Sequence, residues 1–265
     1  MPRVPSWACK MMSVRFRIFA WAVVAYVLLV ILWGALVRAT GSGAGCGGSW
    51  PLCNGGIVPA SPQAATLIEY THRVTSGLLL VAVAGLCFWA FRLFPRGHRT
   101  RRLAVLSALF LVLEALLGAG LVLFNYVTPD ASLGRILYLS AHYLNTQVLL
   151  GLLTLTALSP GWEPPPRRSR LRMATLPVAL VVGVSGVAAA LGHLTLHPAV
   201  AAMGGLFILH AAARRSRRVV VLVVAQFGAG VANLLLHTPV WMQVGHLLVA
   251  DLIWISLVML VASGE

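Results

Sequence analysis

The stretch "IEYTHRVTSGLLLVAVAGLCFWAF" (residues 68–91) places three ionisable side chains at the head of a long apolar run. A helix needs about 20 mainly apolar residues to cross the hydrocarbon core of a bilayer, so this stretch predicts a membrane helix. Glu69 and His72 stand three residues apart and therefore share one face of that helix. Ionisable groups are costly inside a membrane, which makes Glu69, His72 and the adjacent Arg73 candidate functional residues.

The composition of the whole chain indicates the same environment. Hydrophobic residues make up 59% of the sequence and charged residues 10%, and the mean hydropathy is +0.89. These values are typical of a polytopic membrane protein and exclude an ordinary soluble domain. The formal net charge of +14 does not indicate a nucleic-acid partner, because the basic residues form short clusters between apolar runs. Membrane lipid is the expected surrounding, and no nucleic acid is expected.

Eight apolar runs predict an all-α polytopic membrane protein with eight transmembrane helices. The run at 196–213 lies closest to the lower limit of length. The runs are 17–39, 66–94, 103–126, 136–158, 174–192, 196–213, 219–237 and 240–262.

The positions of Lys and Arg predict how these helices are oriented. All but three of the 20 basic residues fall within the first 17 residues or around the alternate connections 94–103, 159–173 and 213–219. The three exceptions are Arg38, Arg73 and Arg135. Because cytoplasmic loops carry the excess of Lys and Arg, we expect a multi-pass protein of the prokaryotic cell (inner) membrane with both termini cytoplasmic.

A proline-rich connection, "SPGWEPPPRRSR" (159–170), divides the chain into four helices and four helices. We therefore expect an N-terminal half over 17–158, a Pro/Arg-rich cytoplasmic linker over 159–171 and a C-terminal half over 172–262. The stretch "LLGAGLVLFNYVTP" (116–129) resembles "QFGAGVANLLLHTP" (226–239) in its Gly-Ala-Gly and in its Thr-Pro eleven residues from the first glycine. Two pseudo-symmetric four-helix bundles are the predicted architecture.

Four of the eight histidines lie at a common depth, within about two turns of the outer ends of the predicted second, fourth, sixth and eighth helices. They are His72, His142, His197 and His246. Each could simply hydrogen-bond between helices. One histidine on each alternate helix, two per half, instead favours iron ligation, because a porphyrin iron in a helical bundle takes axial imidazoles from facing helices. A non-haem metal is less favoured, since Glu69 is not part of a carboxylate cluster.

The first outer loop carries Cys46 and Cys53 around "GGSWPL". The expected compartment is oxidising, so a disulfide is permitted. A redox-active dithiol is the second interpretation. A zinc half-site is the third, although no matching Cys-x-x-Cys partner is present.

Together these motifs resemble the haem A synthase family, in its bacterial form with an outer-loop cysteine pair. The resemblance rests on "GALVRATGSG" (34–43), the cysteine pair, "EYTHR" (69–73), His142, His197 and "HLLVADLIW" (246–254). It covers nearly the whole chain. His193 competes with His197 for one ligand position, and Glu114 stands where similar sequences are expected to have glutamine.

Membership implies an oxidoreductase that converts haem O to haem A for terminal oxidases. It implies a substrate haem O, and its product haem A, in the N-terminal half and a haem b in the C-terminal half. Haem O synthase, terminal-oxidase assembly and a second copy of the chain are the candidate partners. The competing function is a dihaem cytochrome b electron-transfer subunit without catalysis, which explains the histidines but not the carboxylate or the cysteines.

Under the enzymatic interpretation each polar residue has an expected role. His72 and His142 hold the N-terminal haem, and His197 and His246 hold the C-terminal haem. Glu69 acts as a proton acceptor or stabilises a cationic intermediate while the methyl group is hydroxylated in successive steps and water is lost. The alternative for Glu69 is an ion pair with Arg73 or Arg38. Both arginines are also candidate partners of haem propionates, because a guanidinium group matches a carboxylate.

Overall fold

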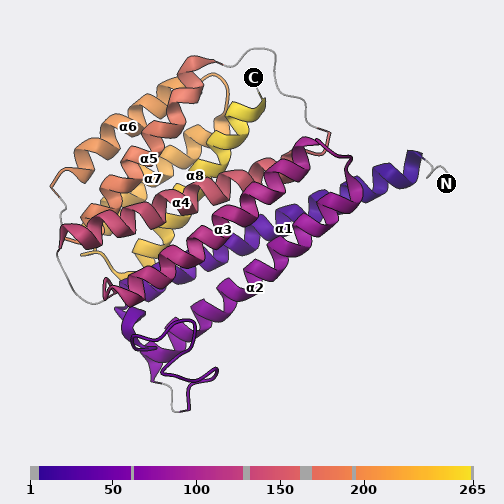
Figure 1. Cartoon of the computed structure of the whole chain (residues 1–265). Helices are drawn as coiled ribbons and strands as arrows, with labels where there is room; N and C mark the ends of the chain where they lie inside the picture. The colour runs from indigo at the N-terminus through magenta and orange to yellow at the C-terminus, as the bar shows by residue number, and fades with distance from the viewer. Residues whose placement is uncertain (1–5, 61–62, 128–131, 162–168, 193–194, 264–265) are drawn as a thin grey trace.

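The structure is a computed structural model that describes residues 6–60, 63–127, 132–161, 169–192 and 195–263. These residues form eight α-helices and no strand, which confirms the all-α prediction with eight helices (Figure 1). The helices are α1 Ser6–Ala39, α2 Ala64–Leu93, α3 Arg99–Leu123, α4 Leu133–Leu158, α5 Arg170–Ala190, α6 His197–Ala212, α7 Arg217–Leu235 and α8 Val240–Ser263.

Seven of these helices are long and apolar enough to cross a membrane, so the chain is a multi-pass membrane protein. The exception is α6, which has 16 residues. At a rise of about 1.5 Å per residue such a helix falls short of a hydrocarbon core of about 30 Å. Eight membrane-crossing helices were expected, but α6 is shorter than a membrane crossing requires.

Several helices begin a few residues before the predicted apolar runs, because polar residues cap their first turns. Ser132, Ser169 and Ser216 each accept a hydrogen bond from the backbone N–H three residues on. His98 accepts one from Thr100 at the start of α3. A side-chain acceptor at this position satisfies an N–H that the helix leaves free, so the basic first turns become helical.

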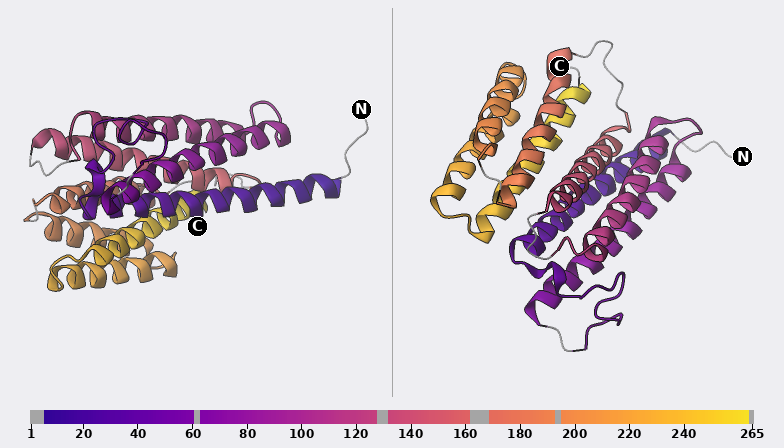
Figure 2. Two further views of the ribbon diagram at one scale, coloured as in Figure 1. Left: turned by 90° about the horizontal axis from the view of Figure 1, so that it is seen from below. Right: turned by 60° about the vertical axis from the view of Figure 1, so that its left-hand side comes forward.

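The packing order of the first four helices is repeated in the last four. Helices α1 to α4 pack in chain order, and α1 also packs on α4. Helices α5 to α8 do the same, and α5 also packs on α8. The two groups meet where α1 packs on α8, where α4 packs on α5 and where α4 packs on α8 (Figures 1 and 2). Residues 162–168 of the expected linker, and Thr128 and Pro129 of the expected repeat, lie outside the described residues.

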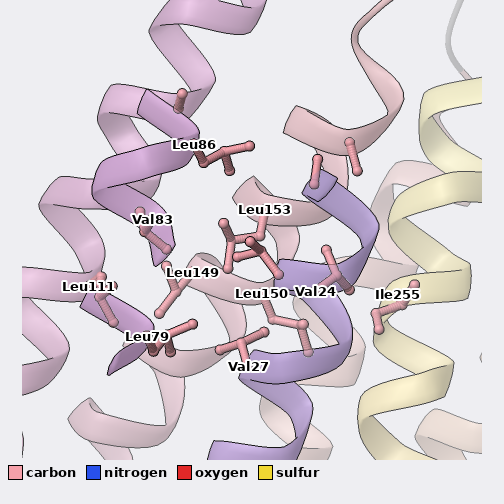
Figure 3. Close-up of a cluster of buried hydrophobic side chains, with 14 of the residues drawn as sticks. Val24, Val27, Leu79, Val83, Leu86, Leu111, Leu149, Leu150, Leu153 and Ile255 are labelled. Atoms are coloured by element: carbon pink, nitrogen blue, oxygen red, sulfur yellow. The ribbon is translucent and has the colours of Figure 1, made fainter. Parts of the chain in front are cut away.

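The largest cluster of buried apolar side chains lies between α1, α2 and α4, with contributions from α3 and α8 (Figure 3). Lipid is as apolar as these side chains, so close packing rather than exclusion of water holds the helices together. The lipid-facing surface is apolar as well, as the exposed Val81, Phe88 and Leu109 illustrate. The labelled core residues are Val24, Val27, Leu79, Val83, Leu86, Leu111, Leu149, Leu150, Leu153 and Ile255.

Candidate functional site

The loop between α1 and α2 is closed by a disulfide between Cys46 and Cys53, with a Cα–Cα distance of 4.4 Å. Both cysteines are buried. Beyond the bridge, Cys53 and Gly56 exchange backbone hydrogen bonds. The disulfide interpretation of the cysteine pair is therefore confirmed, and it leaves neither thiolate free for a zinc half-site.

The loop is fastened to the first turns of α2 by close backbone contacts. Thr66 donates its hydroxyl hydrogen to the carbonyl oxygen of Gly45 at 2.8 Å. A Cβ atom on Gly45 would come within 2.5 Å of the backbone of Ala65, so only glycine permits this approach. The disulfide-bonded loop thus lies directly over the turn of α2 that bears Glu69.

Glu69 is 3% exposed, and both of its carboxylate oxygens are engaged. The backbone N–H of Cys46 donates to Oε2 at 2.7 Å. Arg73 donates to Oε1 from Nη2 at 2.5 Å and from Nε at 3.2 Å. The ion pair expected as the alternative for Glu69 is therefore formed, with Arg73 as its partner. The guanidinium and the backbone N–H together fix the position of the carboxylate.

Arg73 also fixes the loop above it. Its Nη1 donates to the carbonyl oxygens of Ser49 at 2.7 Å and Leu52 at 2.6 Å. Arg38 lies apart from this cluster and donates from Nη2 to Oε1 of Gln243 on α8 at 2.9 Å. The two candidate propionate partners therefore differ, because Arg73 already has an anionic partner and Arg38 is bonded to a neutral amide.

The four candidate ligand histidines share one packing arrangement. Each lies on an even-numbered helix against a glycine of the helix that precedes it, and its ring atom nearest to the Cβ position of that glycine is Cε1. The pairs are His72 with Gly34 at 3.1 Å, His142 with Gly118 at 3.9 Å, His197 with Gly186 at 3.3 Å and His246 with Gly230 at 3.4 Å. Glycine lets membrane helices approach closely, and here it also leaves room for an imidazole ring.

The histidines also pair by proximity. His72 is close enough to His142 for a charge on one ring to affect the other. His246 is close enough to His197 for the same effect. The buried Nδ1 atoms of His72, His142 and His246 have no hydrogen-bond partner among the described residues. His197 differs, because its Nδ1 lies 2.9 Å from Oγ of Ser185. Buried polar atoms are almost always satisfied, so three buried Nδ1 atoms without a hydrogen-bond partner favour a further group at these sites.

The residues present fit a haem. Two imidazoles from facing helices, with glycine on the neighbouring helix, suit a flat macrocycle with axial ligands. Within the described residues no three His, Cys, Asp or Glu side chains gather as a bare metal ion would require. The competing ligand His193 lies outside the described residues. His98 stacks on Phe94 in the connection between α2 and α3 instead.

Two neighbours of the histidines had no assigned role in the sequence. Oε1 of Glu114 on α3 lies 3.5 Å from Nδ1 of His142. Nε2 of Gln226 on α7 lies 3.1 Å from Nε2 of His246. Their spacing in the sequence could have indicated this, because Glu114 and Gln226 each stand four residues before the glycine that faces the histidine.

The family model described as "Cytochrome oxidase assembly protein" (COX15-CtaA) matches residues 17–197. The chain belongs to the COX15-CtaA family. The matched range runs from α1 to the first residue of α6, so it includes Glu69, His72 and His142 and ends at His197. His246 lies beyond the COX15-CtaA match.

Individual relatives extend the comparison of this COX15-CtaA chain. "Protoheme IX farnesyltransferase" of Thermus thermophilus is 38% identical over an alignment of 309 positions, which covers 99% of this chain and 49% of that protein. "Heme A synthase" of Halalkalibacterium halodurans is 42% identical over 140 residues, or 53% of this chain and 45% of that protein. "Heme A synthase" of Bacillus cereus is 48% identical over 99 residues, or 37% and 32%. The chain spans about half the length, or less, of the curated relatives it matches.

Proposed function

We propose that this chain is a haem A synthase, which oxidises the methyl group of haem O to a formyl group. Membership of the COX15-CtaA family and the heme A synthases among its relatives support this. The observation that carries the proposal is Glu69, a buried carboxylate fixed by Arg73 and the N–H of Cys46, one turn from His72. A dihaem electron carrier requires the histidines but has no use for this carboxylate.

The two groups of four helices form two halves related by a pseudo-two-fold axis. The repeated packing order supports this relation, since the α1–α8 and α4–α5 contacts are then equivalents of one another. The α4–α8 contact lies on the axis. The common histidine–glycine arrangement in all four helix pairs supports it as well.

Each half holds one haem. In this proposal His72 and His142 hold the substrate haem O in the N-terminal half, and His197 and His246 hold a haem b in the C-terminal half. When bound, the haem iron supplies the redox chemistry by which the methyl carbon is oxidised. The chain's own residues position the macrocycle, exclude water and handle protons. The contact of Ser185 with Nδ1 of His197 leaves Nε2 of that ring for iron, whereas Nε2 of His246 would have to give up its contact with Gln226.

In this proposal the carboxylate of Glu69 acts on the reacting methyl group. Its carboxylate stabilises positive charge that develops at the edge of the macrocycle, and it accepts a proton there. The Arg73 ion pair and the Cys46 N–H hold it in one position, so little reorganisation accompanies the reaction. The disulfide-bonded loop covers this side and limits the access of water.

Arg38 is the better of the two candidate partners for a haem propionate. It is bonded to the neutral amide of Gln243, whereas Arg73 is already paired with Glu69. An anionic propionate gains more from a guanidinium that has no carboxylate partner in this contact.

The protein lies in the prokaryotic cell (inner) membrane with both ends of this chain in the cytoplasm. The basic clusters on alternate connections support that orientation, as does the disulfide in a loop on the opposite side. An enzyme that farnesylates haem would supply the substrate. The match to a relative named protoheme IX farnesyltransferase agrees with such a partner. Terminal-oxidase assembly would take the product, and a homo-oligomer is a further proposal.

Pigment analysis of the purified protein tests this function. Haem O or haem A extracted beside haem b is the expected result. Haem b alone would favour the electron carrier, and a protein without haem would contradict both. The analysis should include membranes in which haem O is supplied, so that a lack of substrate is not mistaken for a lack of activity.

A further inference from the structure

His142 and His246 have polar neighbours that differ in charge. Glu114 lies four residues before Gly118, which faces His142, and Gln226 lies four residues before Gly230, which faces His246. The two side chains face different ring nitrogens, because Glu114 lies 3.5 Å from Nδ1 of His142 and Gln226 lies 3.1 Å from Nε2 of His246. One carries a carboxylic acid and the other a neutral amide, so the two histidines have unlike electrostatic surroundings.

The carboxylate of Glu114 is held in place by the helix that carries His142. Nδ2 of Asn145 donates to Oε2 at 2.5 Å, and the hydroxyl of Thr146 donates to Oε1. Asn145 is itself fixed by a bond from Nδ2 to the carbonyl oxygen of Phe110 at 3.0 Å. The oxygen that accepts from Thr146 is the one that lies 3.5 Å from Nδ1 of His142. The carboxylate is thus aimed at the nitrogen that would carry a proton if Nε2 bound iron.

We propose that Glu114 is a positioning residue that lowers the reduction potential of the haem held by His142. The inference takes the assignment of one haem to each half from the proposed function, and it rests on that function to this extent. A carboxylate at the second imidazole nitrogen makes the ligand more basic and stabilises ferric iron over ferrous iron. Nδ1 of His246 has no hydrogen-bond partner among the described residues, so the C-terminal haem is the easier of the two to reduce.

Glu114 also ties α3 to α4 through Asn145 and Thr146, which a purely structural residue would do as well. The two roles predict different measurements. A structural tie affects thermal stability and haem content. A charge beside the ligand affects the midpoint potential of one haem even when haem content is unchanged.

The experiment is a redox titration of the purified, haem-loaded full chain, followed by its haem absorbance. The N-terminal component is identified by comparison with His246→Ala, which lacks the C-terminal haem. Glu114→Gln keeps size and hydrogen bonding but removes the charge, so it should raise the midpoint potential of the N-terminal haem alone. The matched control is Ser107→Ala, which removes another buried α3–α4 contact, Ser107 Oγ to Thr156 Oγ1 at 3.5 Å, and should move neither potential.

A Glu114→Gln protein with full haem content and unchanged potentials would overturn the inference, as would an equal shift of both haems. If the Glu114→Gln protein loses its N-terminal haem, the same titration is made on Glu114→Asp, which keeps the charge. Retained haem at a potential near that of the unaltered protein supports the inference, and lost haem overturns it. The titration works with haem b in both halves. A protein that makes no haem A but shows this shift would therefore contradict the proposed function and leave the inference standing.

Discussion

Gln147 on α4 donates from Nε2 to Oδ1 of Asp251 on α8 at 2.9 Å, although 104 residues separate them in the chain. Each lies five residues after a candidate ligand, Gln147 after His142 and Asp251 after His246. Asp251 is fully buried, and its Oδ2 has no partner among the described residues. Trp254 adds a bond from Nε1 to the carbonyl oxygen of Gln147 at 2.7 Å. This polar contact joins the two groups of helices at the α4–α8 crossing.

Asp251→Ala should destabilise the protein by about 1–3 kcal/mol, because it leaves the buried amide of Gln147 without its acceptor. Asp251→Asn retains an acceptor oxygen and should remain within about 1 kcal/mol of the unaltered protein. Thermal unfolding in detergent, followed by helical circular dichroism, measures both. Equal stability of all three proteins would show that the contact does not hold the halves together.

Gly34→Val should reduce occupancy of the N-terminal haem, because a Cβ there already lies 3.1 Å from Cε1 of His72 and a branched side chain needs more room. Gly77→Ala is the control on α2, since no atom lies within 4 Å of its added Cβ. Haem absorbance per mole of protein is the readout. A Gly34→Val protein with full haem content would mean that the glycine serves helix contact alone.

His197→Ala and His246→Ala should each lose the C-terminal haem b while the protein still inserts, since a ligand is removed but the apolar helices are not. Reduced-minus-oxidised spectra of the purified variants report the loss. If both variants keep the full b-type absorbance, the ligand assignment is wrong, and His193 becomes the next residue to replace.

Cys46 and Cys53 should react with a membrane-impermeant thiol reagent only after reduction, and only from the outer side. Cys87 serves as an internal reference, because it lies within α2 and donates to the carbonyl oxygen of Ala104. Labelling of the reduced pair from the cytoplasmic side would reverse the orientation proposed for every helix.

The helices were predictable because the bilayer requires long apolar runs and places basic clusters in the connections between them. Eight crossings were expected from length, and α6 is too short for one. The Cys46–Cys53 bridge was one of three interpretations that spacing and compartment permitted. The side-chain pairing could not be predicted, since it depends on how helices rotate against one another. Sequence spacing places Glu69 and Arg73 on one face, but only the packed loop brings the N–H of Cys46 to the carboxylate. The Gln147–Asp251 contact likewise requires the two halves to be placed together.

The most direct test of the account is the amount of haem A formed per bound haem O in Glu69→Gln compared with the unaltered protein. The amide that replaces the carboxylate would still accept a bond from the N–H of Cys46, so haem binding through His72 and His142 should persist. The charge of the carboxylate and its basicity are lost, and conversion should fall by about 10²–10⁴-fold, the usual contribution of a positioned acid or base. Haem O or a partly oxidised alcohol should then accumulate. Conversion per bound haem that equals that of the unaltered protein, with only stability or haem content reduced, would contradict a catalytic Glu69.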